Sequence, residues 1–159
     1  MAEAKQQEIP SSARVWESAV LSVDVDAVWK EVRAVTFQWA NDVKSTDISG
    51  DVSAVGGTRC IHYNDGTQQT VQIMEISDLR KSVTYNVISS EPAVTYTSAT
   101  HQITLREVTN PSGDAKAQTF VEWTSDYSND ASISVIEDSR YKKKTAFGQM
   151  AKFFAEQKK

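Results

Sequence analysis

One long amphipathic segment closes the chain, from about residue 134 to 157, after about ninety residues of strand-like segments and tight turns. Phe147, Met150 and Phe154 recur in it at three- and four-residue intervals and therefore share one face of a helix. A single helix cannot cover a large flat sheet. This order of elements therefore restricts the chain to a sheet that curves around its last helix.

The closing helix has a predicted start and an underfilled middle. Ser134 and Glu137 have the S-x-x-E spacing of a capping box, which predicts that the helix begins there. Tyr141, Thr145 and Gln149 widen the apolar stripe with small or polar groups, where a helix packed tightly on a sheet would carry Leu or Ile. This stretch must face either solvent or an internal space.

The composition is that of an ordinary globular domain. The 159 residues are 40% hydrophobic and 24% charged, which fits one domain at 13–159 after a flexible arm at 1–12. Cys60 is the single cysteine and cannot form an internal disulfide, and no apolar run approaches the roughly 18 residues of a membrane span. We expect a cytoplasmic protein that is a monomer or a weak homodimer.

Charge and motifs exclude several classes of function. A net charge of −4 and a pI near 5.2 argue against nucleic-acid binding, which needs a concentrated basic face. The run Lys142–Lys144 is interpreted as a solvated helix face. Cys60 and His62 alternate onto one strand face without further ligands nearby, and no nucleotide-binding loop or hydrolase elbow occurs. We expect no metal and no cofactor.

The rest of the chain reads as strands with a helical insertion. Asp24 is placed to cap a short helix, and a second short helical turn is expected at Thr36–Asn41. Turn-forming clusters separate the strands and indicate antiparallel pairing. The seven predicted strands are Ala13–Leu21, Val43–Ser49, Thr58–Tyr63, Gln68–Ser77, Ser82–Ser89, Val94–Val108 and Ala117–Tyr127.

These elements predict an α+β fold in which a curved, seven-stranded antiparallel sheet wraps around the long C-terminal helix. Two short helices follow the first strand and close one end. A sheet that grips one helix leaves a gap between them, and such gaps in soluble folds are commonly apolar ligand cavities with a few orienting polar groups.

Several stretches carry a family resemblance. They are Val25–Trp29, Val55–Arg59, Val83–Ile88, Tyr96–Thr100, Val121–Trp123 and the closing helix. Over about residues 13–157 the chain resembles the START-like, birch-pollen-allergen superfamily, and within it the polyketide cyclase/dehydrase-like group with the plant abscisic-acid receptors and lachrymatory-factor synthase. The resemblance implies the helix-grip fold. It does not imply one activity, because this fold hosts many.

Strand alternation, anchored at Arg59, predicts which residues face the cavity. On that strand Arg59, Ile61 and Tyr63 point inward. The full set of expected ligand-binding residues is Lys44, Arg59, Ile61, Tyr63, Gln72, Met74, Tyr85, Val87, Tyr96, Ser98, Val121, Trp123, Tyr127, Tyr141, Thr145 and Gln149.

Two cations in this set need partners, because a buried unpaired charge costs several kcal/mol. Resemblance to the hormone receptors implies that Lys44 contacts a ligand carboxylate; the alternative is a strand-edge lysine with its ammonium in water. Resemblance to lachrymatory-factor synthase implies a catalytic Arg59 opposite a glutamate. Gln72 stands at the matching position and cannot titrate, so a structural or ligand-orienting Arg59 is preferred.

Two functions therefore remain. The preferred one is binding of a small, mostly hydrophobic ligand with a carboxylate or carbonyl group, as a carrier or sensor. The alternative is a cyclase, dehydratase or isomerase that uses the same cavity, with Arg59, Gln72 and a tyrosine stabilising charge. A protein-interaction module is a third and weaker reading. A hormone-gated switch is not expected, because the turn Asn64–Gly66 is too short for a gate.

Overall fold

The computed structural model describes residues 13–113 and 116–157, so the expected arm at 1–12 lies outside the described residues. Two helices and seven strands follow the predicted order. They are β1 (Arg14–Leu21), α1 (Val25–Arg33), β2 (Val43–Ser49), β3 (Thr58–Tyr63), β4 (Gln68–Ser77), β5 (Ser82–Glu91), β6 (Ala99–Glu107), β7 (Thr119–Tyr127) and α2 (Ile133–Gln157). The predicted α+β class and all seven strands are confirmed.

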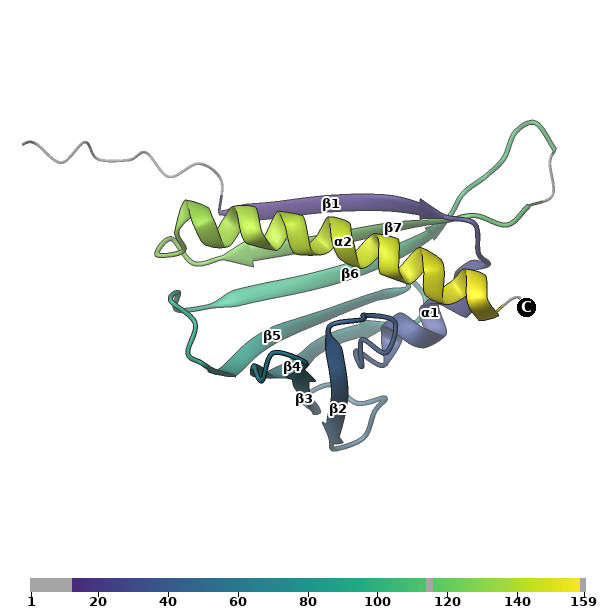
Figure 1. The fold of residues 1–159 in the computed structure, drawn as a ribbon. Helices are drawn as coiled ribbons and strands as arrows, with labels where there is room; N and C mark the ends of the chain where they lie inside the picture. Colours follow the sequence, from purple (N-terminus) through teal and green to yellow (C-terminus); the bar gives the residue numbers. More distant parts are fainter. Residues whose placement is uncertain (1–12, 114–115, 158–159) are drawn as a thin grey trace, which may run out of the picture.

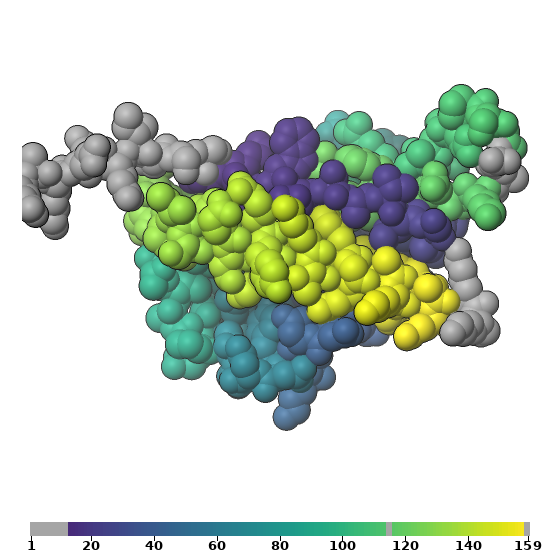
Figure 2. Space-filling view, turned by 45° about the horizontal axis from the view of Figure 1, so that its top comes forward, coloured from purple at the N-terminus to yellow at the C-terminus, as the bar shows by residue number. Residues whose placement is uncertain are grey.

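The strands form one antiparallel sheet in the order β1-β7-β6-β5-β4-β3-β2. The long helix α2 runs across one face of this sheet, beside β1, and α1 lies near its C-terminal end (Figure 1). In the space-filling view of Figure 2, β1 borders α2 on one side and the chain around β2 borders it on the other. The sheet therefore grips the helix, as predicted.

The predicted apolar stripe of α2 forms its contact with the core. Phe147, Met150 and Phe154 are buried in one cluster with strand residues such as Ile103 and Val121. Full burial of side chains of this size stabilises the fold by roughly 1.5–3 kcal/mol each. The C-terminal half of α2 is therefore held to the sheet by ordinary hydrophobic packing.

The helix α1 forms as expected. The side chain of Asp24 accepts hydrogen bonds from the amides of Asp26 and Ala27, at 2.9 and 3.4 Å, which caps the first turn. Two apolar residues on its inner face, Val28 and Val32, are buried against β5 and β6. This helix closes one end of the sheet.

The second short helix expected at Thr36–Asn41 is not present; residues 34–42 form a series of turns. Val35 and Phe37 adopt φ angles of +52° and +54°, in the left-handed region, where a right-handed helix cannot continue. The turns bury Phe37 and Trp39 instead. This segment therefore supplies aromatic rings to the interior.

The capping box predicted at Ser134 and Glu137 is also wrong. Ser132 caps α2: its hydroxyl accepts from the Val135 amide at 3.3 Å. Ser134 already lies inside the helix, and Glu137 pairs with Arg140 at 2.9 Å. The helix begins at Ile133, so its cap, Ser132, lies two residues before the predicted cap Ser134.

Arg59 is a structural residue in the core. Its side chain is fully buried, with 0% exposure, and burial lowers its pKa. The guanidinium donates to three backbone carbonyls, those of Ala34 at 2.8 Å, Thr58 at 3.1 Å and Val52 at 3.1 Å. It therefore ties the end of α1 and the β2–β3 connection to β3.

We predict that Arg59→Lys lowers the free energy of unfolding by about 2–4 kcal/mol, because the three donors of an ammonium sit on one nitrogen and cannot reach carbonyls that bond three different nitrogens of the guanidinium. Urea unfolding measures this change. The matched control is Arg106→Lys, at an exposed position on β6, and it should change stability by less than about 0.5 kcal/mol. Equal effects of the two substitutions would contradict the structural role of Arg59.

Candidate functional site

A cavity of about 690 Å³ lies between α2 and the inner face of the sheet. This volume is within the usual range for sites that hold small organic ligands. Its helical wall includes Ser139, Tyr141, Lys143, Thr145 and Gln149, which confirms the expected space behind Tyr141–Gln149. The other walls come from β3 to β7, the turns at 37–42 and the loop at 93–96.

Most of the expected site residues line this cavity. They are Ile61, Tyr63, Tyr85, Val87, Tyr96, Trp123, Tyr127, Tyr141, Thr145 and Gln149. The structure places six others outside it, namely Lys44, Arg59, Gln72, Met74, Ser98 and Val121. Of these, Arg59 and Val121 point inward but are packed in the core, and Ser98 is exposed on a loop.

The orientation predicted for Gln72 and Met74 on β4 is wrong. Val71 and Ile73 are buried instead, and Met74 is 45% exposed. Val71 pairs with the inward-facing Arg59, so Val71 and Ile73 share the inward face. The pairing of β4 with β5 skips Met74, between Ile73 and Glu75. Because this bulge displaces the alternation by one residue, Gln72 and Met74 are out of phase with Ile76, which packs against the core, and strict alternation along the whole strand fails.

Lys44 is displaced from the cavity by the same kind of irregularity. The pairing of β2 with β3 shifts between Val43 and Ser45, so that Val43 lines the cavity while Lys44 is exposed. Its ammonium therefore lies in solvent, which was the alternative reading of this residue.

Lys143 is a buried cation in the cavity wall. The sequence predicts a solvated helix face for the run Lys142–Lys144, and for Lys143 this prediction is wrong. Lys143 is only 4% exposed. Its Nζ donates to the hydroxyls of Ser125 at 2.5 Å and Ser139 at 2.9 Å, and lies 5.1 Å from the centroid of the Trp123 ring. No carboxylate forms a salt bridge with Lys143 among the residues that the structure describes. Burial lowers its pKa to about 8, an effect that Glu17 partly opposes.

A helical-spacing signal for Lys143 was present in the sequence. The inward positions of α2 are Ile136, Ser139, Lys143, Phe147, Met150 and Phe154, which follow one another at intervals of three and four residues. Lys143 and Phe147 therefore occupy the same face of the helix. Only Lys143 of the three consecutive lysines has this phase, and Lys142 and Lys144 are exposed.

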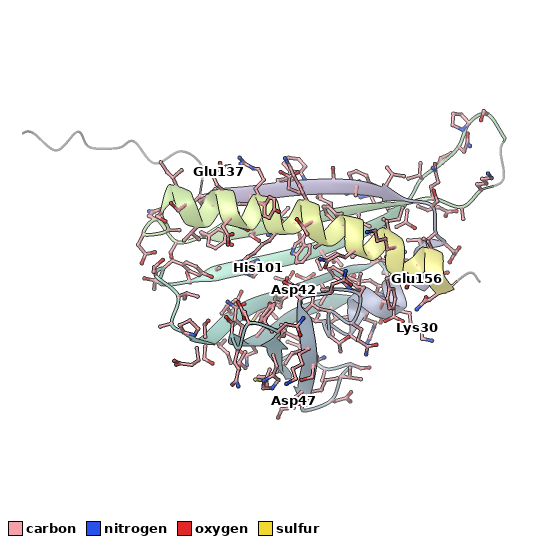
Figure 3. The ribbon with its side chains drawn as sticks, in the orientation of Figure 1. Lys30, Asp42, Asp47, His101, Glu137 and Glu156 are labelled. Atoms are coloured by element: carbon pink, nitrogen blue, oxygen red, sulfur yellow. The ribbon has the colours of Figure 1, made fainter. Side chains whose placement is uncertain are left out.

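Ser125 links Lys143 to His101 on β6. Its Oγ lies 2.5 Å from Lys143 Nζ and 2.5 Å from His101 Nδ1. An ammonium can only donate, so Ser125 accepts from Lys143 and is free to donate its own proton to His101. Burial, with a smaller contribution from Lys143, lowers the pKa of His101 to about 3, so the imidazole is neutral. Figure 3 shows His101 beneath α2.

Aromatic rings form most of the remaining wall. Trp123 stacks on Phe37 with a centroid distance of 5.9 Å, and Tyr85 stacks on His101 at 5.1 Å. Burial raises the pKa of Tyr63 to about 12, so its phenol keeps its proton at neutral pH. The indole Nε1 of Trp123 is buried and makes no well-formed hydrogen bond among the described residues, although the Tyr85 side chain interacts with it. A buried donor without a well-formed hydrogen bond reduces the stability of the fold.

The two ends of the cavity differ. At one end Gln149 accepts a hydrogen bond from the Asn41 amide at 2.9 Å, which joins α2 to the turns at 34–42. At the other end Tyr141 is 69% exposed, and Lys142 pairs with Asp138 at 2.9 Å. The loop at 93–96 also contributes lining there. The open end is therefore bordered by the first half of α2.

Two features are absent from residues 13–113 and 116–157. No group of three or more His, Cys, Asp or Glu side chains in this part of the chain is arranged to hold a metal ion. None of the described helices is long and apolar enough to cross a membrane.

Solved structures of similar architecture identify the fold. A protein from Nitrosospira multiformis superposes with a TM-score of 0.74 at 21% identity, over 92% of this chain and 99% of that chain. The predicted helix-grip fold is therefore confirmed. Ginseng major latex-like protein 151 from Panax ginseng has a TM-score of 0.68 at 15% identity, over 88% of this chain and 95% of that chain.

Ara h 8.0201 has a TM-score of 0.66 at 14% identity, over the same shares of the two chains, 88% and 95%. No protein-family model and no curated protein matches the sequence. At these identities the likeness establishes the helix-grip fold, and the ligand must be argued from the cavity itself.

We predict that Lys143→Met raises the free energy of unfolding by about 1–2 kcal/mol at pH 7, because removing a buried ammonium outweighs the loss of two hydrogen bonds. The pKa of Lys143 is about 8 in the folded protein against an ordinary value of 10.5. Between these values the unfolded chain retains a proton that the folded protein has lost. The free energy of unfolding of the wild type therefore rises relative to that of the variant as pH increases from about 8 to 10.5.

Urea unfolding at pH 7 and pH 10 tests this prediction, with the exposed Lys144→Met as the matched control. The control should change stability by less than about 0.5 kcal/mol at either pH. A Lys143→Met variant that is less stable than wild type at pH 7, or whose difference from wild type does not depend on pH, would show that Lys143 is not a destabilising buried cation.

Proposed function

We propose that the protein binds a small, mostly apolar ligand with a carboxylate or carbonyl group in this cavity, as a carrier or sensor. The observation that carries the proposal is Lys143, a cation buried in the wall of an aromatic cavity and without a salt bridge to any described carboxylate. Burial of an ammonium is unfavourable unless an opposite charge or sufficient hydrogen bonds compensate it.

The hydrogen-bonding capacity of the wall supports an acceptor group on the ligand. An ammonium has three N–H donors, and Lys143 uses two of them on Ser125 and Ser139. The indole N–H of Trp123 makes no well-formed hydrogen bond with a described residue and lines the adjoining wall, on β7. A carboxylate or carbonyl oxygen would satisfy these donors, while the aromatic rings would cover the apolar part of the ligand.

The choice of anchor differs from the one expected from sequence. The resemblance to hormone receptors placed the ligand carboxylate at Lys44, whose side chain is exposed on β2. We assign that role to Lys143, on the opposite wall. The cyclase-type alternative loses its expected support, because neither Arg59 nor Gln72 lines the cavity.

A matched pair of fluorescent probes tests the proposal. 1-Anilinonaphthalene-8-sulfonate and N-phenyl-1-naphthylamine share one apolar framework, and only the first carries an anionic group, which stands in for a carboxylate. We predict that wild type binds the sulfonate more tightly, and that Lys143→Met weakens sulfonate binding about tenfold and changes binding of the neutral probe less than about twofold. Fluorescence titration measures both affinities.

The exposed Lys144→Met is again the control and should leave both affinities unchanged. The sulfonate preference should also decline as pH rises past about 8, because Lys143 then loses its charge. If neither probe binds, the cavity does not accept apolar ligands. If Lys143→Met weakens both probes equally, the lysine shapes the cavity and does not recognise the anion.

A further inference from the structure

We propose that Lys143 is a carbonyl-reactive amine, which forms an imine with an aldehyde or ketone ligand held in the cavity. The inference rests on the proposed function, because the ligand must first occupy this cavity. It concerns ligands that have an apolar body and a carbonyl group. With these ligands Lys143 would form a reversible covalent bond in place of a hydrogen bond.

The surroundings of Lys143 suit a neutral amine. A lysine attacks a carbonyl only through its unprotonated nitrogen, and desolvation in an apolar pocket favours that form. The hydrogen-bond partners of Nζ are the hydroxyls of Ser125 and Ser139, which can accept from an ammonium and donate to an amine equally well. No described carboxylate pairs with Lys143 to hold the proton on the nitrogen.

The groups that face Lys143 from neighbouring elements are consistent with this role. Glu17 on β1 favours the charged form. Ser125 on β7, which bonds to Nζ, is neutral, and so are two further titratable groups that contact Ser125, His101 on β6 and Tyr127 on β7. The ring of Trp123 lies against the amine, with the centroid 5.1 Å from Nζ. Its indole N–H, which makes no well-formed hydrogen bond with a described residue, provides a donor on the adjoining wall for the carbonyl oxygen.

The reaction needs no oxidant or reductant. The Nζ lone pair forms a bond to the carbonyl carbon, the C=O π pair moves to oxygen, and one proton passes from nitrogen to oxygen to give a carbinolamine. The C–O bond then breaks, the oxygen leaves as water with a second proton from nitrogen, and a C=N bond forms. One imine and one water result from each amine and carbonyl.

Ser125 is placed to relay these protons. Its hydroxyl lies 2.5 Å from both Lys143 Nζ and His101 Nδ1, so a proton leaving Nζ can pass to Ser125 as the hydroxyl proton moves to His101. The same path returns the proton to the departing oxygen. Ser125 is thus a positioning and relay residue, and Lys143 is the group that reacts.

Reductive trapping tests the imine. The full-length protein is incubated with 2-naphthaldehyde and cyanoborohydride at pH 7.5, and the products are analysed by intact mass and peptide mapping. We expect one adduct, heavier than the protein by the mass of the aldehyde less one oxygen atom, located on Lys143. Lys144, the exposed neighbour, should be labelled at least about tenfold more slowly.

Variants separate the roles of the residues. Lys143→Met should lose the fast adduct, and Lys144→Met should retain it. Ser125→Ala should slow trapping about tenfold at saturating aldehyde and leave the half-saturating aldehyde concentration unchanged, since a relay affects the reaction and not binding. A rise in the half-saturating concentration alone would assign Ser125 to ligand binding and remove it from the proton path.

Displacement of N-phenyl-1-naphthylamine by the aldehyde, measured without reductant, separates the two proposals. If the aldehyde displaces the probe but Lys143 is labelled no faster than Lys144, the imine is refuted and the binding function stands. If the aldehyde neither displaces the probe nor labels Lys143, both are refuted for this ligand class. Displacement together with a single Lys143 adduct supports both.

Discussion

One long helix must cover the inner face of a seven-stranded sheet, and the rest of the structure depends on how it packs there. The stripe of α2 is apolar where Phe147, Met150 and Phe154 pack into the core. Earlier in the helix the same stripe continues through Ser139 and Lys143, whose side chains are too polar to fill a core. The sheet therefore closes on the second half of α2 and leaves a cavity under the first half.

The cavity combines two groups that a stable core would exclude. A buried ammonium at Lys143 and an indole N–H at Trp123 that makes no well-formed hydrogen bond with a described residue both reduce the stability of the fold. Such groups are typical of sites where stability is given up for recognition of a ligand. Both groups line the cavity, and Lys143 Nζ lies 5.1 Å from the centroid of the Trp123 ring. We therefore assign the site to a ligand with an acceptor oxygen.

Sequence reasoning predicted the fold well because hydrophobic period, turn residues and the Asp24 cap all act locally. It failed where tertiary contacts decide. Bulges reversed the faces of Met74 and Lys44, and the left-handed φ of Phe37 replaced an expected helix with turns. Lys143 was missed because a run of three lysines suggests a solvated surface, although its spacing from Phe147 places it inward.

The contact between Lys143 and Ser125 has a consequence for how α2 is seated. An apolar stripe alone would tolerate sliding of the helix along the sheet by a turn, since one hydrophobic contact can replace another. A buried ammonium cannot be moved to an apolar neighbour without losing its hydroxyl partners. The polar contact therefore selects one alignment of helix and sheet, much as a buried polar residue fixes the register of a coiled coil. The residue that weakens the core thereby gives the cavity a defined shape.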